Sequence, residues 1–162
     1  MAAKALILTE VLAGAGPDTL AVVMLSDCDA CEDKRAGLRQ AAKEPRFAGL
    51  NVVVGVADKM REAWVLNGFI AKPGAETETL RRLTTELSFD PIREAVRLRA
   101  PKPSEPRHPK RVLSELTSGD PAREEHCWRA TPLRQLRERG VATGLTAFLD
   151  ELRDHLTPLI GR

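Results

Sequence analysis

Two aspartates close an apolar stretch near the start of the chain, in the run Leu25-Ser26-Asp27-Cys28-Asp29. If the apolar residues form a buried strand, both carboxylates emerge at its carboxyl end, where open α/β sheets bind their ligands. Mg²⁺ takes oxygen ligands and often binds through one or two carboxylates while keeping several waters. Asp27 and Asp29 are therefore candidate magnesium ligands. The alternative is that both aspartates are solvated and one of them caps the next helix.

A second pair of acids, Asp58 and Glu62, follows a valine-rich stretch. If the two apolar stretches are parallel neighbouring strands, these acids emerge at the same sheet edge as Asp27 and Asp29. Acidic clusters at the ends of two strands suit a metal site that acts on phosphodiesters. In the alternative interpretation, Glu62 pairs with a neighbouring Lys or Arg on a solvated helix face, which contributes little energy.

The motif Cys28-Asp29-Ala30-Cys31 supports a competing chemistry, because a strand, a CxxC motif and a helix form a thioredoxin-like redox site. A helix N-terminus lowers the pKa of such a thiol, whereas the flanking aspartates disfavour the thiolate. Zinc binding with His126 and Cys127 is a further option. Adjacent residues on a helix point about 100° apart, which makes joint ligation by His126 and Cys127 awkward.

A basic segment lies further along the chain: residues 93–111 hold seven Lys or Arg against two Glu. Four prolines fall between positions 101 and 109, which predicts an extended linker or arm. Arg107, Lys110 and Arg111 could contact nucleic-acid phosphates from this arm without reading the base sequence. The alternative is a solvated linker with no ligand.

These residues need elements that position them, and the pattern predicts two strands, over 20–25 and 50–57. Short continuous apolar runs of this kind are typical of strands buried on both faces of a parallel sheet. Helices are predicted over 2–13, 30–43 and 59–68 around the strands, and over 75–87 and about 91–100 after them. Further helices are predicted over 110–117, 121–128, 132–139 and 142–159, with Asp120 as an N-cap and Pro121 at the first helical position.

The predicted fold class is therefore α/β, with a small, mainly parallel sheet flanked by helices and an all-helical C-terminal extension. We expect a core over 1–72, a helical segment over 73–100, a Pro-rich linker over 101–109 and the extension over 110–162. Two strands make a small sheet, so we also expect a further strand or a sheet completed by a partner chain, including a homo-oligomer.

Composition narrows the class of protein. The chain has 162 residues, of which 43% are hydrophobic and 30% charged, with a net charge of +2, as in a soluble globular protein. No apolar run approaches the ~20 residues that span a bilayer, and we find no secretory leader pattern, so the cytoplasm is the expected compartment. The chain has four Phe, two Trp and no Tyr, so few aromatic side chains could stack on the bases of single-stranded nucleic acid.

The order of these features resembles the Toprim domain over residues 20–70. The resemblance rests on the strand ending in Asp27-x-Asp29, the helix after it, and the valine-rich strand leading into Arg61-Glu62-Ala63-Trp64-Val65-Leu66. More narrowly, the chain is similar to short Toprim-like proteins associated with ATPase partners, akin to the overcoming-lysogenization-defect nucleases. The tail from Lys110 to Trp128 also resembles extensions in such proteins.

The resemblance implies Mg²⁺-dependent phosphodiester chemistry on nucleic acid and an ATPase partner. Asp27 and Asp29 match the paired catalytic aspartates, and Glu62 would be an accessory acid. Toprim domains also carry a glutamate on an earlier strand, whereas the early glutamate of this chain, Glu10, falls inside a predicted helix. Enzymatic activity therefore stays open. The alternatives are a non-catalytic interaction subunit that retains the fold, and a thiol-redox protein that uses Cys28 and Cys31.

Overall fold

The computed structural model describes residues 21–28, 32–47 and 50–160 of the chain. The predicted helix over 2–13, with Glu10, lies outside these ranges, and so do Asp29 and Cys31. Cys28 belongs to the described backbone, but its side chain is not part of the description.

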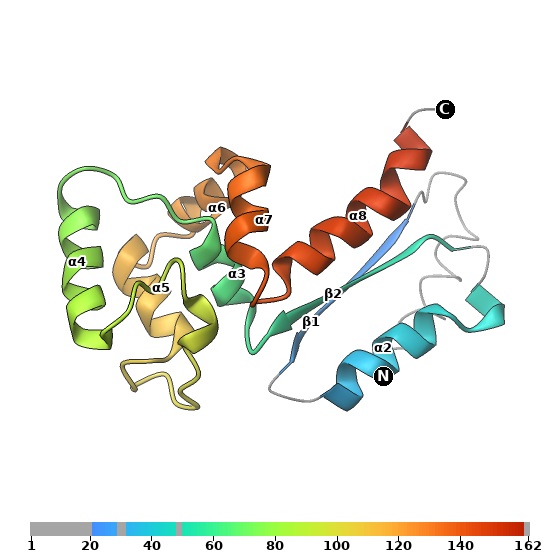
Figure 1. The fold of residues 1–162 in the computed structure, drawn as a ribbon, viewed down its shortest axis with the longest axis horizontal. Helices are drawn as coiled ribbons and strands as arrows, with labels where there is room; N and C mark the ends of the chain where they lie inside the picture. Colours follow the sequence, from blue (N-terminus) through green and yellow to red (C-terminus); the bar gives the residue numbers. More distant parts are fainter. Residues whose placement is uncertain (1–20, 29–31, 48–49, 161–162) are drawn as a thin grey trace.

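Two parallel strands, β1 (Val22–Cys28) and β2 (Val52–Asp58), form the sheet of the described part of the chain. Helix α2 (Glu32–Ala42) crosses from one strand to the other, with the short 3₁₀ helix η1 (Pro45–Phe47) after it. Helix α8 (Leu145–Ile160) lies on the opposite face of the sheet (Figure 1). This arrangement confirms the predicted α/β class and the parallel pairing of the two strands.

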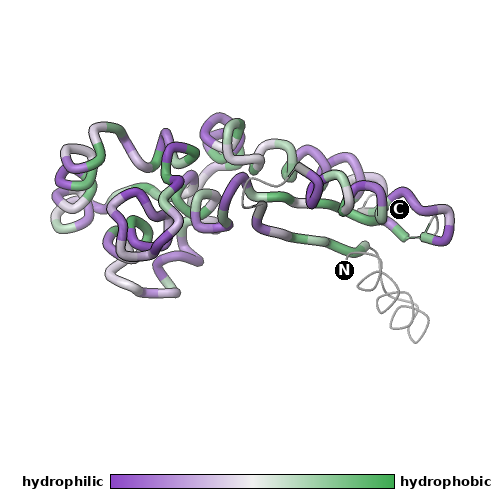
Figure 2. The backbone as a smooth tube through the Cα atoms, turned by 90° about the horizontal axis from the view of Figure 1, so that it is seen from below, coloured by the Kyte–Doolittle hydropathy of each residue, from purple (hydrophilic) through white to green (hydrophobic). Residues whose placement is uncertain are grey.

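The two faces of the sheet are packed differently. On the α2 face, Met24, Val54 and Val56 form a buried apolar cluster with residues of α2 and η1. On the α8 face, Gly55 leaves room for a ring, because a Cβ atom there would lie 2.7 Å from Cδ2 of Phe148. Figure 2, which is coloured by residue hydropathy, shows that the residues of both strands are mostly hydrophobic, as expected for strands between two helices.

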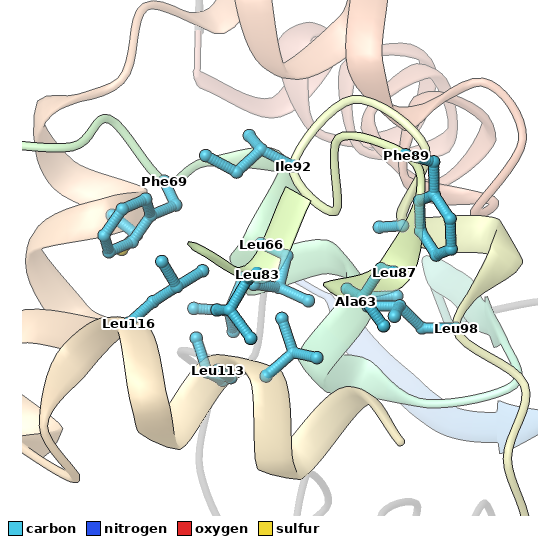
Figure 3. Close-up of a cluster of buried hydrophobic side chains, with 14 residues drawn as sticks. Ala63, Leu66, Phe69, Leu83, Leu87, Phe89, Ile92, Leu98, Leu113 and Leu116 are labelled. Atoms are coloured by element: carbon cyan, nitrogen blue, oxygen red, sulfur yellow. The ribbon is translucent and has the colours of Figure 1, made fainter. Parts of the chain in front are cut away.

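The remaining helices gather in a lobe beyond the carboxyl ends of the strands (Figure 1). They are α3 (Arg61–Asn67), α4 (Ala75–Leu87), η2 (Ala95–Arg97), α5 (Pro109–Thr117), α6 (Pro121–Ala130) and α7 (Leu133–Gly140). The largest apolar core of the described residues lies in this lobe, where Leu66 of α3, Leu83 of α4 and Leu113 of α5 are almost fully buried (Figure 3). None of the described helices is long and apolar enough to cross a membrane.

Trp64 joins the lobe to the sheet. Its indole N–H donates to the carbonyl of Thr143 at 2.6 Å, and its ring stacks on Phe148 of α8 with centroids 5.2 Å apart. Ala57, at the end of β2, belongs to the same small cluster. The junction between sheet and lobe is therefore packed and hydrogen-bonded, which fixes α3 against the ends of the strands.

Local signals set the ends of the lobe helices. Asp120 caps α6 by accepting a hydrogen bond from the backbone N–H of Ala122 at 2.9 Å, and Pro121 occupies the first helical position. This confirms the predicted cap. The ring of His108 caps α5 in the same way, through a hydrogen bond from Lys110 N at 3.2 Å.

Two sequence-based expectations differ from the structure. The predicted helix over about 91–100 is a turn followed by the single 3₁₀ turn of η2. The predicted linker over 101–109 is a folded loop, because Ala100 N donates to Arg107 O at 3.1 Å and the loop ends in the buried residues His108 and Pro109. Elements of the predicted helical extension pack on the predicted core: α8 lies on β2, and α5 lies on α3.

Candidate functional site

The carboxyl ends of the strands bring two of the predicted acids to one edge. In the β1–β2 register, Asp27 lies beside Ala57 and Cys28 beside Asp58. Oδ1 of Asp27 accepts a hydrogen bond from the backbone N–H of Arg61 at 2.8 Å, and its backbone carbonyl accepts one from Nζ of Lys34 at 2.5 Å. Asp27 thus ties the end of β1 to the start of α3. It is the second-last residue of β1, whereas the sequence placed it beyond the end of the strand.

Asp58 is held by the basic segment that the sequence singled out. Its Oδ2 lies 3.3 Å from Nη2 of Arg99, and the neighbouring Lys59 donates from Nζ to the carbonyl of Arg99 at 3.0 Å. The backbone N–H of Asp58 donates to Thr143 O at 2.9 Å. This acid therefore connects the end of β2 with residues about 40 and 85 positions further along the chain.

Glu62 lies in the first turn of α3 with a side chain that is 13% exposed. Its Oε1 is 3.9 Å from Nζ of Lys110, at the start of α5. Its Oε2 is buried and has no hydrogen-bond partner among the described residues. A buried carboxylate oxygen without a partner is costly, so Glu62 is the least satisfied acid of this edge.

The described acids of the edge are not clustered around one point. No three His, Cys, Asp or Glu residues of the described part of the chain lie close enough together to hold a metal ion. Asp58 and Glu62 each face a cation of another segment, and Asp27 faces a backbone N–H. The fourth predicted ligand, Asp29, is outside the described residues. Because Mg²⁺ can bind through one or two carboxylates and several waters, magnesium binding at this edge stays a prediction.

A small cleft opens beside Asp27. It has a volume of about 210 Å³ and is lined by Leu25, Ser26, Asp27, Ala57, Arg61 and Trp64. Pockets for drug-sized ligands usually measure about 300–1,000 Å³. The cleft therefore suits a small group such as a single phosphate better than a whole nucleotide.

The three basic residues predicted to bind nucleic acid differ in their surroundings. Arg107 is exposed, with its guanidinium 5.7 Å from the ring centre of Phe89. Lys110 has a side chain that is 58% exposed. Arg111 is 28% exposed and forms ion pairs with Glu86 at 3.1 Å and Glu115 at 2.8 Å. Arg111 therefore holds α5 against α4, whereas Arg107 and Lys110 are accessible to a ligand.

The structure joins two features that the sequence left separate. The basic segment 97–111 meets the acidic edge at two points, Arg99 with Asp58 and Lys110 with Glu62. Lys34, Arg61 and Arg99 were not among the predicted site residues, although Arg61 and Arg99 belong to the quoted motif and the basic segment. The place of Arg99 could not be inferred without knowing that the loop after η2 folds back onto the strand ends.

Two of the predicted zinc ligands, Cys127 and His126, have different surroundings. Cys127 is buried in the lobe, where burial raises the pKa of its thiol, and Nη1 of Arg123 donates to its Sγ at 3.5 Å. The neighbouring His126 is exposed. The redox hypothesis rests on Cys28 and Cys31, whose side chains lie outside the described part of the chain.

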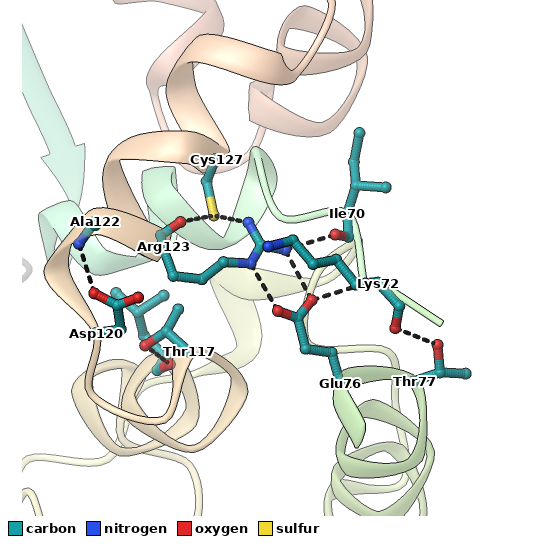
Figure 4. A network of polar contacts seen from close by, with 10 residues as sticks. Ile70, Lys72, Glu76, Thr77, Thr117, Asp120, Ala122, Arg123 and Cys127 are labelled. Carbon is teal, nitrogen blue, oxygen red and sulfur yellow. Dashed lines mark hydrogen bonds and ion pairs between the residues drawn. The ribbon is translucent and has the colours of Figure 1, made fainter. Parts of the chain in front are cut away.

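A buried ion pair, which the sequence did not indicate, lies elsewhere in the lobe. The side chain of Arg123 in α6 is 6% exposed and donates through Nε to Oε1 of Glu76 at 2.8 Å (Figure 4). Its Nη2 donates to Oε2 of Glu76 at 2.9 Å and to the carbonyl of Ile70 at 2.7 Å. The hydrogen bonds from Arg123 lower the pKa of Glu76 to about 2. This ion pair holds α4 against α6, and its role is to stabilise the fold.

Comparison with known proteins found no match to this chain among models of protein families, curated proteins or solved structures.

Proposed function

We propose that this protein binds the phosphodiester backbone of nucleic acid at the carboxyl end of its sheet, as a non-catalytic subunit. The observation that carries the proposal is the meeting of the basic segment with the strand ends, through Arg99 with Asp58 and Lys110 with Glu62. These pairs place a cation beside Asp58 and beside Glu62. They leave the guanidinium of Arg61, which lines the cleft, as a cation without a partner among the described residues.

The chemistry of such binding is electrostatic. Lysine and arginine side chains neutralise phosphates and release condensed counterions, which supplies sequence-independent affinity. Arg61 lies on the cleft beside Asp27, and the exposed Arg107 and Lys110 lie on the loop and helix that reach the same edge. The small cleft can admit one phosphate while the loop contacts its neighbours. Few aromatic residues are present, which favours contact with the backbone over stacking on bases.

Binding of a short duplex DNA, measured by fluorescence anisotropy over a series of salt concentrations, tests the proposal. We expect the double variant Arg61→Ala/Arg107→Ala to bind more weakly and to reduce the salt slope by about 1.8, which is two contacts at 0.9 each. Arg61→Lys/Arg107→Lys keeps both charges and should keep the slope. Arg129→Ala/Arg134→Ala, a matched control on exposed faces of α6 and α7, should leave binding unchanged.

Two results would overturn the proposal. The first is no binding of the parent protein at low salt. The second is an equal loss of affinity in the Arg61/Arg107 variant and in the Arg129/Arg134 control, which would assign the effect to net charge alone.

The second candidate function is Mg²⁺-dependent cleavage of nucleic acid, as the Toprim-like resemblance implies. The buried Oε2 of Glu62, which has no hydrogen-bond partner among the described residues, favours it, because such a carboxylate oxygen could ligate a cation. Asp27 and Asp58 lie at adjacent strand ends, and Asp29 would complete the acidic set. The ATPase partner that the resemblance implies belongs to this candidate.

A nuclease assay with and without Mg²⁺ separates the two candidates. Binding without cleavage is the result expected of a non-catalytic subunit. Cleavage by the parent protein that is lost in Asp27→Asn, and kept in the surface control Asp154→Asn, would replace the first candidate by the second. Asparagine at position 27 can still accept the hydrogen bond from Arg61 N, so the variant should keep the fold.

A further inference from the structure

The outer edge of β1 carries two exposed apolar side chains. Val23 is 46% exposed and Leu25 is 57% exposed, both on the face of the sheet that α8 covers over β2. Helix α8 packs on β2 and leaves the side chains of Val23 and Leu25 on β1 exposed. Large exposed apolar side chains on an edge strand are uncommon in monomers, which usually protect such edges with charges, proline or a bulge.

The same stretch has peptide groups that point away from β2 and have no partner in the described part of the chain. Val22 N donates to Asn51 O at 2.8 Å, and residues of a parallel ladder alternate between bonding to the partner and pointing away from it. The peptide groups of Val23, Leu25 and Asp27 therefore point away from β2. Within the described residues nothing bonds to the peptide groups of Val23 and Leu25. The carbonyl of Asp27, by contrast, accepts hydrogen bonds from Lys34 and Ser26.

We propose that β1 pairs with β1 of a second copy of this chain, antiparallel and about a two-fold axis at Met24, to form a continuous four-stranded sheet. In this register Val23 lies opposite Leu25 of the second copy, and Leu25 opposite its Val23. Each strand offers two N–H and two C=O groups, so the pairing makes four hydrogen bonds from groups that have no partner among the described residues. The four exposed apolar side chains meet on one face.

Hydrogen-bond availability selects this register. An axis at Leu25 would place Val23 opposite Asp27 and would need the carbonyl of Asp27, which Lys34 already engages. An axis at Val23 would set Leu25 against the small Ala21. Only the axis at Met24 uses the peptide groups of Val23 and Leu25 and no others.

Charge selects the antiparallel direction. In the proposed pairing the two Asp27 carboxylates are separated by six residues along the strands, or about 20 Å. That exceeds the Debye length of about 10 Å at 0.1 M ionic strength. A parallel, in-register pair would place the two carboxylates about 4.8 Å apart, and their repulsion would oppose association.

The size of the interface sets the expected affinity. A seven-residue strand edge buries less than the ~1,600 Å² of a standard protein–protein interface. We therefore expect dissociation constants in the micromolar range. Since no charged pair lies in the interface, the dimer should be insensitive to salt, unlike the nucleic-acid binding proposed above. The inference does not rest on that function, although Leu25 also lines the cleft beside Asp27.

Sedimentation velocity of the full chain from about 1 to about 100 µM tests the association. The parent protein should pass from monomer to dimer over this range. Val23→Lys places a charge in the pairing edge and should raise the dissociation constant at least about tenfold. Val141→Lys is the matched control, because Val141 is 70% exposed and lies in the turn before α8. It should dimerise like the parent.

Amide hydrogen exchange of the parent protein, resolved by NMR, locates the contact without relying on a variant. The amides of Val23 and Leu25 should exchange more slowly at high protein concentration, while that of Val54, which faces the outer edge of β2, should not change. A monomer at every concentration would overturn the proposal, and so would a dimer that Val23→Lys leaves intact. Protection of Val23 and Leu25 already in the monomer would also overturn it, because residues 1–20 would then be the occupant of the edge.

Discussion

The clamp between α4 and α6 can be tested by one substitution, Glu76→Gln. It removes the charge that faces Arg123 but keeps the shape of the side chain. The guanidinium of Arg123 is 6% exposed, with its carbon 4.5 Å from the ring centre of Phe69. After the substitution the guanidinium stays buried and keeps the carbonyl of Ile70 as its acceptor. Its charge is no longer neutralised, which is the costly way to break a buried ion pair.

The size of the effect follows from the pKa of Glu76, which falls from an ordinary value of 4.5 to about 2 in the folded protein. At about 1.4 kcal/mol per pKa unit, the pairing stabilises the folded state by about 3 kcal/mol. Because the folded-state pKa is lowered, this contribution is complete above pH 4.5. It is lost as the pH falls towards 2, where the folded protein also takes up the proton.

Urea denaturation followed by circular dichroism, at several pH values between 7 and 2, measures the difference. We expect Glu76→Gln to lower the free energy of unfolding by about 3 kcal/mol at pH 7, and the difference from the parent to shrink steadily below pH 4.5. Glu78→Gln is the matched control on the same helix, where Glu78 pairs with Arg81 on the surface. It should leave the unfolding free energy almost unchanged.

Either of two results would refute this reasoning. One is a loss in Glu76→Gln at pH 7 no greater than that in Glu78→Gln. The other is a loss that stays constant from pH 7 to pH 2, because a pH-independent loss would come from packing and not from the charge.

Three further substitutions test the packing and capping, each by urea denaturation against the parent protein. Gly55→Ala should lower the unfolding free energy by about 1–3 kcal/mol, because the new methyl group would lie 2.7 Å from the ring of Phe148; an unchanged midpoint would contradict this contact. Asp120→Ala should lower the unfolding free energy by about 1 kcal/mol, because α6 loses its N-cap. Asp120→Asn should keep most of the stability of the parent protein, because asparagine also caps helices. Thr143→Val should cost about 1–3 kcal/mol, since it removes the buried hydrogen bond of 2.6 Å to Oδ1 of Asn67; equal stability would show that water replaces the hydroxyl.

Elements with strong local signals could be predicted from the sequence. Helix α4 has the predicted bounds, 75–87, because its residues follow an amphipathic helical pattern. Helix α6 begins where Asp120 and Pro121 indicated. The two strands were found from their continuous apolar runs, although each begins two residues later than predicted and extends further at its carboxyl end. Such ends depend on the partner strand, which local patterns do not report.

Features that depend on contacts between distant residues could not be predicted. Arg123 and Glu76 are 47 positions apart, and Trp64 and Thr143 are 79 apart. The prolines of 101–109 indicated an extended arm, since proline stiffens a chain and removes a hydrogen-bond donor. In the structure Pro109 instead begins α5, and the loop before it closes on itself. Composition could show that the segment is rich in proline. It could not show that Arg99, just before the segment, contacts Asp58 of β2, or that the residue after it, Lys110, contacts Glu62 of α3.

The position of the candidate site follows from this long-range closure. Its acids stand on β1, β2 and α3, whereas the cations that face Asp58 and Glu62 come from the loop after η2 and from α5. A two-stranded sheet is marginal by itself, and the largest apolar core lies in the lobe, where Leu66 of α3 packs with α4 and α5. Helix α3 thus carries Arg61 and Glu62 at its start and Leu66 near its end. The lobe is therefore part of the site: folding it is what brings Arg99 and Lys110 to the strand ends.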